Sequence, residues 1–160
     1  MADLKPVTMR GVRIIFRNFR GEAGKYNQEG TRNFGVILPP EVAEAMANDG
    51  WNVKMLMPRE EDAEEGEQPV PWLPVEAAFS KGRPPQAVMI TERGRTNLTE
   101  DTVQRLDYVD ISNVDMIVNP STYDVNGRQG VKAYLKSIYV TIEEDELERE
   151  YAEKFEGREQ

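Results

Sequence analysis

The chain has 160 residues, of which 39% are hydrophobic and 31% are charged, and this is enough for one domain with a single core. It contains no cysteine and no histidine, which excludes zinc fingers, cysteine or histidine nucleophiles, Ser-His-Asp triads and disulfide bonds. The formal net charge of −9 argues against a protein that coats nucleic acid, because phosphate groups repel an acidic surface.

The charge is unevenly divided along the chain. Residues 1–36 carry seven Lys or Arg against three Asp or Glu, whereas residues 60–67 carry six acids and residues 141–160 carry nine acids against three bases. The two acidic segments account for more than the whole net charge, so the rest of the chain is net positive. A basic, aromatic body with an acidic end indicates binding to single-stranded nucleic acid, with a separate contact for partners.

The first predicted elements form a hairpin. Alternating apolar residues over 7–19 predict a strand that buries Ile14 and Phe16. A second strand over residues 31–38 buries Phe34 and pairs with the first, because glycines punctuate the segment between them.

The following elements are short and separated by Pro and Gly, which predicts a mainly β fold, a small barrel or sandwich with short helices. Segment 58–74 is acidic and rich in proline and is expected to be a loop, which Trp72 holds against the body. The Asn126-Gly127 pair is a strong hairpin signal between the last two strands. Strands are expected over 51–57, 74–80, 87–91, 114–120 and 130–142, and helices over 40–49, 99–106 and 143–156.

Cations interleaved with aromatic residues form the first candidate site. Single-strand binders need cations for the phosphates and flat rings on which bases stack, and arginine supplies both a charge and a plane. The alternative interpretation is a solvated strand face whose aromatic residues belong to the core. The candidates are Arg13, Arg17, Phe19, Arg20, Lys25, Tyr26 and Arg32.

A second group of candidates lies on later predicted strands and is expected to line the far wall of the same groove. Alternating Lys and Tyr on one strand face suit phosphates and bases, although lysines there also discourage edge-to-edge aggregation. A tryptophan that opens a strand can stack on a base, although tryptophans more often belong to the core. The residues are Trp51, Lys54, Arg128, Lys132, Tyr134 and Lys136.

Two other classes of function stay open at this point. Asp107, Asp110 and Asp115 could hold Mg²⁺ for a nuclease, although acids near turns are usually caps or solvated. The acidic composition also fits an interaction protein that mimics DNA and occupies a DNA site on a host protein. No Walker A or GxGxxG motif is present, so neither nucleotide hydrolysis nor dinucleotide binding has support.

Short motifs spread over most of residues 10–150 carry a family resemblance. They include Phe16-Arg-Asn-Phe-Arg-Gly21, Tyr26-Asn-Gln-Glu-Gly30, Asp49-Gly-Trp-Asn-Val-Lys54 and Gly130-Val-Lys-Ala-Tyr-Leu-Lys136. With the acidic end, they resemble single-stranded DNA-binding proteins of tailed bacteriophages. The resemblance implies an OB-fold barrel that binds single strands without sequence preference in phage DNA replication, recombination or repair. It also implies that the acidic C-terminus contacts other replication proteins.

We therefore expect residues 1–142 to form an OB-like single-stranded DNA-binding domain and residues 143–160 to form an acidic C-terminal helix or tail. The protein is expected to have no enzymatic activity, cofactor or metal. Its expected partners are single-stranded DNA and phage or host replication proteins. Homodimerisation through the C-terminal helix stays open. Since no signal peptide or membrane span is apparent, we expect it in the cytoplasm of the host bacterium.

Overall fold

The structure is a computed structural model that describes residues 4–24, 28–57, 69–79, 82–143 and 147. Within these residues it has one α-helix, α1 (Pro40–Asn48), and one short 3₁₀ helix, η1 (Val103–Asp107). The strands of the same residues are β1 (Val7–Met9), β2 (Ile14–Asn18), β3 (Asn33–Ile37), β4 (Lys54–Leu56), β5 (Val70–Glu76), β6 (Gln86–Thr91), β7 (Gly94–Leu98), β8 (Ile111–Val125) and β9 (Arg128–Ile142).

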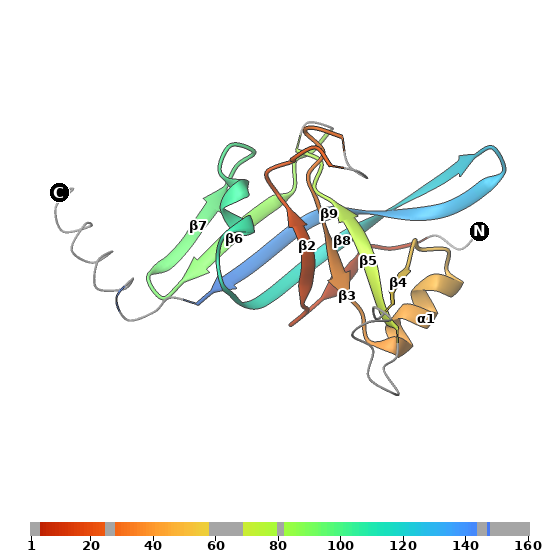
Figure 1. Cartoon of the computed structure of the whole chain (residues 1–160), viewed down its shortest axis with the longest axis horizontal. Coiled ribbons are helices and arrows are strands. Elements are labelled where there is room, and N and C mark those ends of the chain that lie inside the picture. The colour runs from red at the N-terminus through yellow and green to blue at the C-terminus, as the bar shows by residue number, and fades with distance from the viewer. Residues whose placement is uncertain (1–3, 25–27, 58–68, 80–81, 144–146, 148–160) are drawn as a thin grey trace.

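All nine strands belong to one sheet in which β9 is the central strand. β9 pairs with β8 on one edge, and on the other edge it pairs in parallel first with β5 and then with β6. β5 continues into β3 and β2, and β4 and β7 extend β5 and β6. Figure 1 shows the long β8–β9 hairpin crossing the molecule, with the β6–β7 hairpin near one end and α1 near the other.

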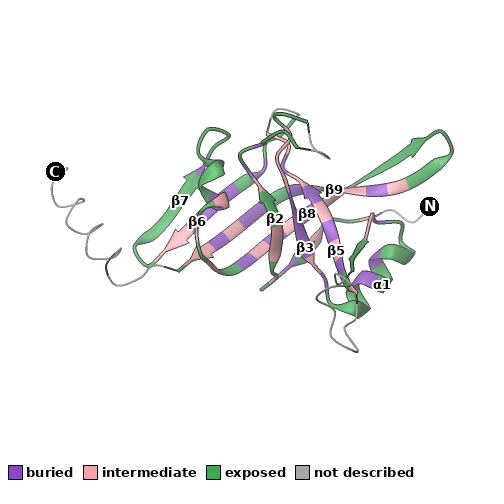
Figure 2. Cartoon of the chain, viewed as in Figure 1, coloured by how far each residue is buried: buried purple, intermediate pink, exposed green. Residues whose placement is uncertain are grey.

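The mainly β prediction is confirmed, as are the helix near residues 40–49 and the hairpin turn at Asn126-Gly127. The sheet curls around one core, and the β8–β9 ribbon is banded with buried positions until its exposed tip (Figure 2). The predicted C-terminal helix over 143–156 lies almost wholly outside the described residues. No helix in the described part of the chain is long and apolar enough to cross a membrane.

The prediction of one continuous strand over residues 7–19 is wrong, because the segment forms two strands. Residues 7–9 form β1, which pairs with β8, whereas residues 14–18 form β2, which pairs with β3. Gly11, with a φ of 60°, lies between them in the left-handed region that glycine adopts readily. The alternating pattern is common to both strands, so periodicity alone does not reveal the break.

A β-bulge in β2 reverses the burial that the sequence pattern predicts for Phe16 and Phe19. Ile15 faces Gly35, but Asn18 faces Asn33, so β2 has one residue more than β3 between these pairs. Phe16 has a φ of 51° and is 57% exposed, so the expectation that it belongs to the core is wrong. Phe19 is fully buried, and its ring stacks on Phe34 with centroids 5.0 Å apart.

Strand β5 begins inside the segment 58–74 that we predicted to be a loop. It includes Pro71 and Pro74, residues that usually argue against a sheet interior. Pro74 lies beyond the pairing with β4 and before the pairing with β9, where one edge of β5 has no strand partner. The missing N–H of proline therefore costs no ladder bond on that edge.

The β8–β9 hairpin extends beyond the rest of the sheet, and Tyr123 contributes to its attachment to the body together with the backbone bonds between Val131 and residues 50–52. The Tyr123 hydroxyl donates a hydrogen bond to Oδ1 of Asn52 at 2.9 Å. A Cβ at Gly130 would lie 2.4 Å from the Tyr123 oxygen, so only glycine allows this close approach. The ring therefore lies against the opposite strand of its own hairpin.

Helix η1 is held beside β2 by two side chains. The carboxylate of Asp107 accepts the backbone N–H groups of Phe19 and Arg20 at 2.8 and 2.9 Å. Arg17 Nη1 donates to the carbonyl oxygens of Leu106 and Val109 at 2.9 and 2.8 Å. These bonds fix the turn that follows β2.

Replacing Asp107 with alanine leaves two backbone donors without their acceptor. We expect Asp107→Ala to lower the free energy of unfolding by about 1–3 kcal/mol, measured by urea denaturation. Asp110→Ala is the matched control, because the Asp110 side chain is exposed and only its carbonyl accepts a hydrogen bond, from Glu143. Equal stability of the two variants would contradict the anchoring role of Asp107.

Candidate nucleic-acid interface

The outer face of the sheet carries a tryptophan seated on a glycine. Trp72 in β5 is half-buried, and a Cβ at Gly35 of β3 would lie 2.6 Å from its Cε3 atom. No side chain other than hydrogen fits beneath the indole at that position. Gly35 thus lets the ring of Trp72 lie close against the backbone of the neighbouring strand.

Two further side chains complete this surface, which we call the aromatic platform: Phe16, Trp72 and Lys54. The rings of Phe16 and Trp72 meet edge to face, with centroids 5.1 Å apart. Lys54 Nζ lies 5.8 Å from the Trp72 ring centroid. An exposed ring next to a cation offers a base a surface for stacking and a phosphate a charge.

Tyr134 and Lys132 of β9 lie next to the far end of β5. Tyr134 faces Glu76 in the register, and Lys132 Nζ lies 3.0 Å from a Glu76 carboxylate oxygen and 5.0 Å from the Tyr134 ring centroid. Partial burial lowers the pKa of Lys132, but its hydrogen bond to Glu76 and the nearby charges outweigh this, so the net shift is upward. Lys132 is therefore charged, but Glu76 already compensates part of its charge.

Tyr108 is an exposed aromatic residue that the sequence interpretation missed. It follows η1, is 68% exposed, and accepts a hydrogen bond from Arg20 Nη1 at 2.8 Å. Arg20 also forms an ion pair with Glu22. Hydrogen bonding to Tyr108, followed by that to Glu22, raises the pKa of Arg20 above its ordinary value.

Two of the predicted stacking residues need correction. Phe19 is fully buried against Phe34, and Trp51 is 5% exposed where it bridges to Val131 beneath the hairpin. Neither ring offers a face to a base. The bulge in β2 explains Phe19, and Trp51 is covered because the β8–β9 hairpin lies beside it.

Some of the predicted cations are engaged by other groups of the protein and others only lie exposed, and Arg17 and Arg20 are both exposed and engaged. Arg17 holds η1, and Arg32 donates to the Phe19 carbonyl and lies 4.0 Å from Glu100. The predicted residues Lys25 and Tyr26 lie outside the described residues. Exposed positions are occupied by Arg13, Arg20, Lys54, Arg128 and Lys136.

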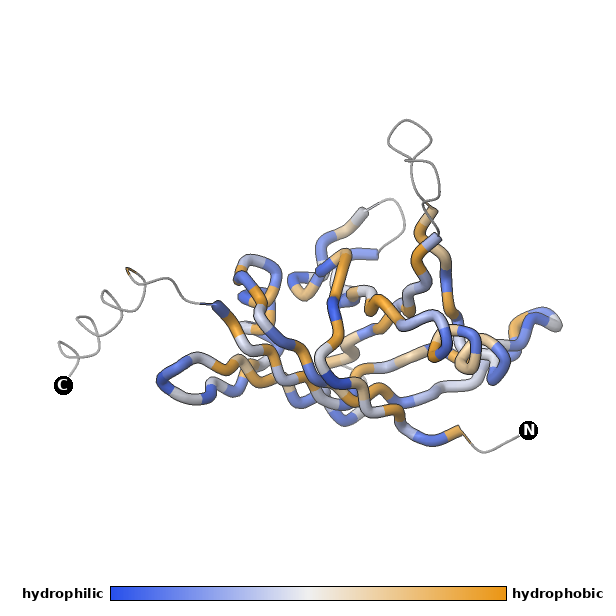
Figure 3. Tube along the Cα trace, turned by 90° about the horizontal axis from the view of Figure 1, so that it is seen from below, coloured by the Kyte–Doolittle hydropathy of each residue, from blue (hydrophilic) through white to orange (hydrophobic). Residues whose placement is uncertain are grey.

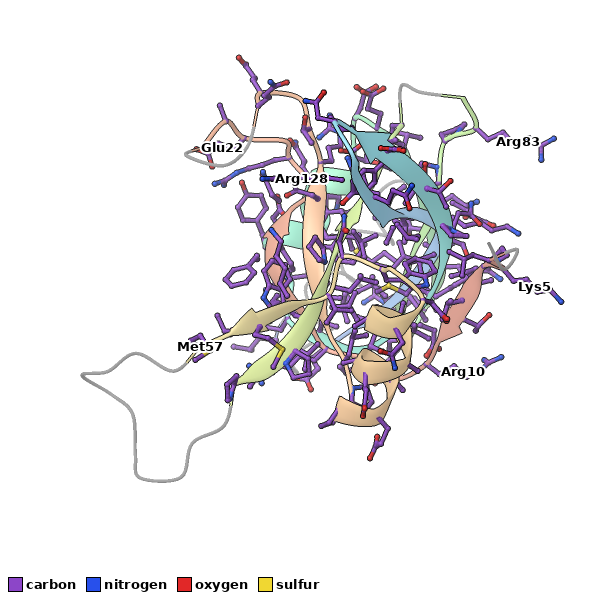
Figure 4. The ribbon with its side chains drawn as sticks, turned by 90° about the vertical axis from the view of Figure 1, so that its right-hand side faces the viewer. Lys5, Arg10, Glu22, Met57, Arg83 and Arg128 are labelled. Atoms are coloured by element: carbon purple, nitrogen blue, oxygen red, sulfur yellow. The ribbon has the colours of Figure 1, made fainter. Side chains whose placement is uncertain are left out.

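The basic N-terminal segment does not form one continuous patch. Figure 4 shows Lys5 and Arg10 on the opposite side of the molecule from Glu22 and Met57. Met55, Leu56 and Met57 are exposed at the end of β4, where the tube of Figure 3 is orange. Exposed apolar residues at the end of β4 lie close in the chain to Lys54 of the platform.

The acids suspected of holding magnesium have other roles. Asp107 accepts two backbone N–H groups, and Asp115 accepts the N–H of Gly11 at 2.9 Å. In the described part of the chain, no three acidic residues lie close enough together to hold a metal ion. This geometry gives the nuclease interpretation no support.

A curled β-sheet with an aromatic and basic outer face is typical of proteins that bind single-stranded nucleic acid. Residues 1–160 match the model of a family described as a putative phage single-stranded DNA-binding domain, so the chain belongs to that family. Membership makes it a phage single-stranded DNA-binding protein and not an enzyme. Among curated proteins, no sequence matches the chain.

Two solved structures of the single-stranded DNA-binding protein from bacteriophage Enc34 have a similar fold. The protein from bacteriophage Enc34 in complex with single-stranded DNA is similar with a TM-score of 0.52 and 11% identity, over 88% of each chain. A C-terminal truncation of the Enc34 protein gives a TM-score of 0.50 and 12% identity, covering 88% of this chain and 87% of that one. The gp2.5 protein of bacteriophage T7 aligns at 10% identity over 90% and 92% of the two chains, with a TM-score of 0.43.

Phe16 can be replaced without disturbing its backbone. Asparagine tolerates the positive φ at this position, so Phe16→Asn should keep the fold while it removes the ring. We expect its affinity for oligo(dT) to fall by about 5- to 150-fold, which corresponds to the roughly 1–3 kcal/mol of one stacked base. Fluorescence anisotropy measures the affinity, with Val42→Asn on the exposed side of α1 as control. An unchanged affinity would remove Phe16 from the interface.

Proposed function

We propose that this protein binds single-stranded DNA without sequence preference through the aromatic platform and the neighbouring face of β9. The observation that carries the proposal is the exposed ring of Phe16 packed against the half-buried Trp72, with Lys54 beside it. A contiguous exposed apolar patch rimmed by polar residues often marks a ligand-binding site. Stacking accepts every base, because every base has a flat face.

The remaining charged and aromatic candidates would extend this interface. Tyr108 and Arg20 lie beyond the β2 edge, and Tyr134 with Lys132 lies beside β5. Exposed cations at Arg13, Arg128 and Lys136, with Lys25 and Tyr26, are proposed to contact phosphates or bases along the same strand. Arg17 and Arg32 would act by holding the turn after β2 in place.

We also propose an OB-like barrel of residues 1–142 that acts in phage DNA replication, recombination or repair in the host cytoplasm. The acidic segment 143–160 would be a separate part that contacts phage or host replication proteins, and a homodimer is compatible with this organisation. The proposal rests on the family membership and on the position of the negative charge at this end of the chain. No observation on the structure favours the alternative of an acidic DNA mimic.

A salt titration tests the proposed function. Anisotropy of a labelled oligo(dT) of about 30 nucleotides, longer than the ~4–16 nucleotides bound per OB fold, should show binding that weakens with salt. The logarithm of the association constant should fall with the logarithm of salt concentration by about 0.7 per neutralised phosphate. Duplex of equal length is the control. Affinity that does not depend on salt, or equal affinity for duplex, would contradict the proposal.

Removal of residues 143–160 tests whether the acidic segment competes with DNA. The deletion removes nine acidic and three basic residues, which together carry a net charge of −6. We expect tighter binding of oligo(dT) at low salt and a smaller gain at high salt, because salt screens the repulsion. The same titration of the full chain supplies the comparison. Identical affinities at low salt would mean that the segment does not oppose DNA.

A further inference from the structure

The outer face of the β6–β7 end carries a second ring and cation that no predicted site includes. Arg95 of β7 places its guanidinium carbon 5.7 Å from the ring centroid of Tyr139 in β9. Tyr139 lies between Ile138 and Val140, which are both fully buried in the core. Because side chains alternate along a strand, the Tyr139 ring points away from the core, as the Tyr134 ring does between Ala133 and Leu135.

Tyr139 also sits over an apolar position on this outer face. Its cross-strand neighbour Val88 is fully buried, yet Val88 does not belong to the main core cluster. Val88 thus faces outward and is covered there, with Tyr139 directly beside it. The register places Tyr139 beside this covered apolar position, and a ring that is ordered by its neighbours loses little entropy when a base stacks on it.

Within the part of the chain that the structure describes, no carboxylate compensates the charge of Arg95. Among the described residues no ion pair involves Arg95, whereas Arg20, Arg32 and Lys132 are each paired with a glutamate. Asp115 faces Tyr139 in the register, and its Oδ1 accepts the Gly11 N–H, which holds this carboxylate toward the β1 side of β8. A guanidinium stacked on a ring can receive a phosphate while the ring takes a base.

The topology places this pair in line with the aromatic platform. β5 and β6 pair in parallel with the same edge of β9, so β6 follows where β5 ends (Figure 1). Along this line Trp72 precedes Glu76, which faces Tyr134, and β9 then runs on to Tyr139. At about 3.3 Å per residue, the path from Trp72 to Tyr139 is about 30 Å, or about nine nucleotides at the 3.4 Å spacing of stacked bases.

We propose that Tyr139 and Arg95 form a second stacking and phosphate position, which binds the same DNA strand several nucleotides beyond the aromatic platform. The inference rests on the proposed function and adds to it the path of the bound DNA over β5 and β9 and the approximate length of that path. Short oligonucleotides would occupy the platform alone. Longer ones would reach both positions along the outer face of β9.

The test compares oligo(dT) of about 6 and about 20 nucleotides on the full chain and its variants. Arg95→Gln keeps part of the side chain over Tyr139 but removes the charge. We expect it to weaken binding of the long oligonucleotide about 5-fold or more and to reduce its salt slope by about 0.7, with the short one unchanged. Arg83→Gln is the matched control, because Arg83 is exposed and extends away from the body in Figure 4.

A second variant tests whether Tyr139 contacts DNA or only covers Val88. Tyr139→Leu keeps an apolar group next to Val88 but removes the aromatic plane, and it should weaken only the long oligonucleotide, by about 5-fold or more. Equal weakening on both lengths, or none on either in both variants, would overturn the inference. If the unmodified chain binds neither length, the proposed function itself fails. If the unmodified chain binds both oligonucleotides and the variants bind them with the same affinities, the proposed function stands and only the second binding position is refuted.

Discussion

The pairing of β9 with three strands is the constraint on which the rest of the molecule depends. β8 occupies one edge of β9, and β5 and β6 share the other edge in succession. A single strand therefore sets both the curl of the sheet over the core and the line along which outward side chains follow one another. The outer residues of β5 and β9 lie on one continuous surface because their strands are parallel and adjacent, although they are distant in sequence.

The bulge in β2 shows why the sequence could not place the interface correctly. Alternation assigned Phe16 to the core and left Phe19 for a base, and one extra residue in β2 reversed both assignments. Periodicity carries no information on where an extra residue falls, because the pattern on either side of it looks regular. We predicted Trp72 to lie in a loop because prolines surround it, yet β5 accommodates Pro74 where it lacks a partner on one edge.

The features that local sequence determines were predictable. The mainly β class, the helix after Pro39-Pro40 and the Asn126-Gly127 turn follow from glycine, proline and alternation. The basic and aromatic composition correctly indicated single-stranded nucleic acid, and the family resemblance correctly indicated DNA. The fate of each cation was not predictable, because Arg17 and Arg32 are engaged by carbonyl groups and acids that only the tertiary fold brings near. Tyr108 gave no signal, since a single tyrosine after a helical turn has no periodicity.

The place of β9 in the chain also governs when the molecule can fold. β2 and β3 are close in sequence and can pair early, but Val7 must wait for Val118, and β5 and β6 for the last strand of the sheet. Pairings over such long separations close slowly because they must first overcome the entropy of the intervening loop. During translation, the nascent chain therefore carries β5 and β6 with open edges until the ribosome has released residues 128–142. Synthesis of β9 is the event that turns a set of separate hairpins into one sheet.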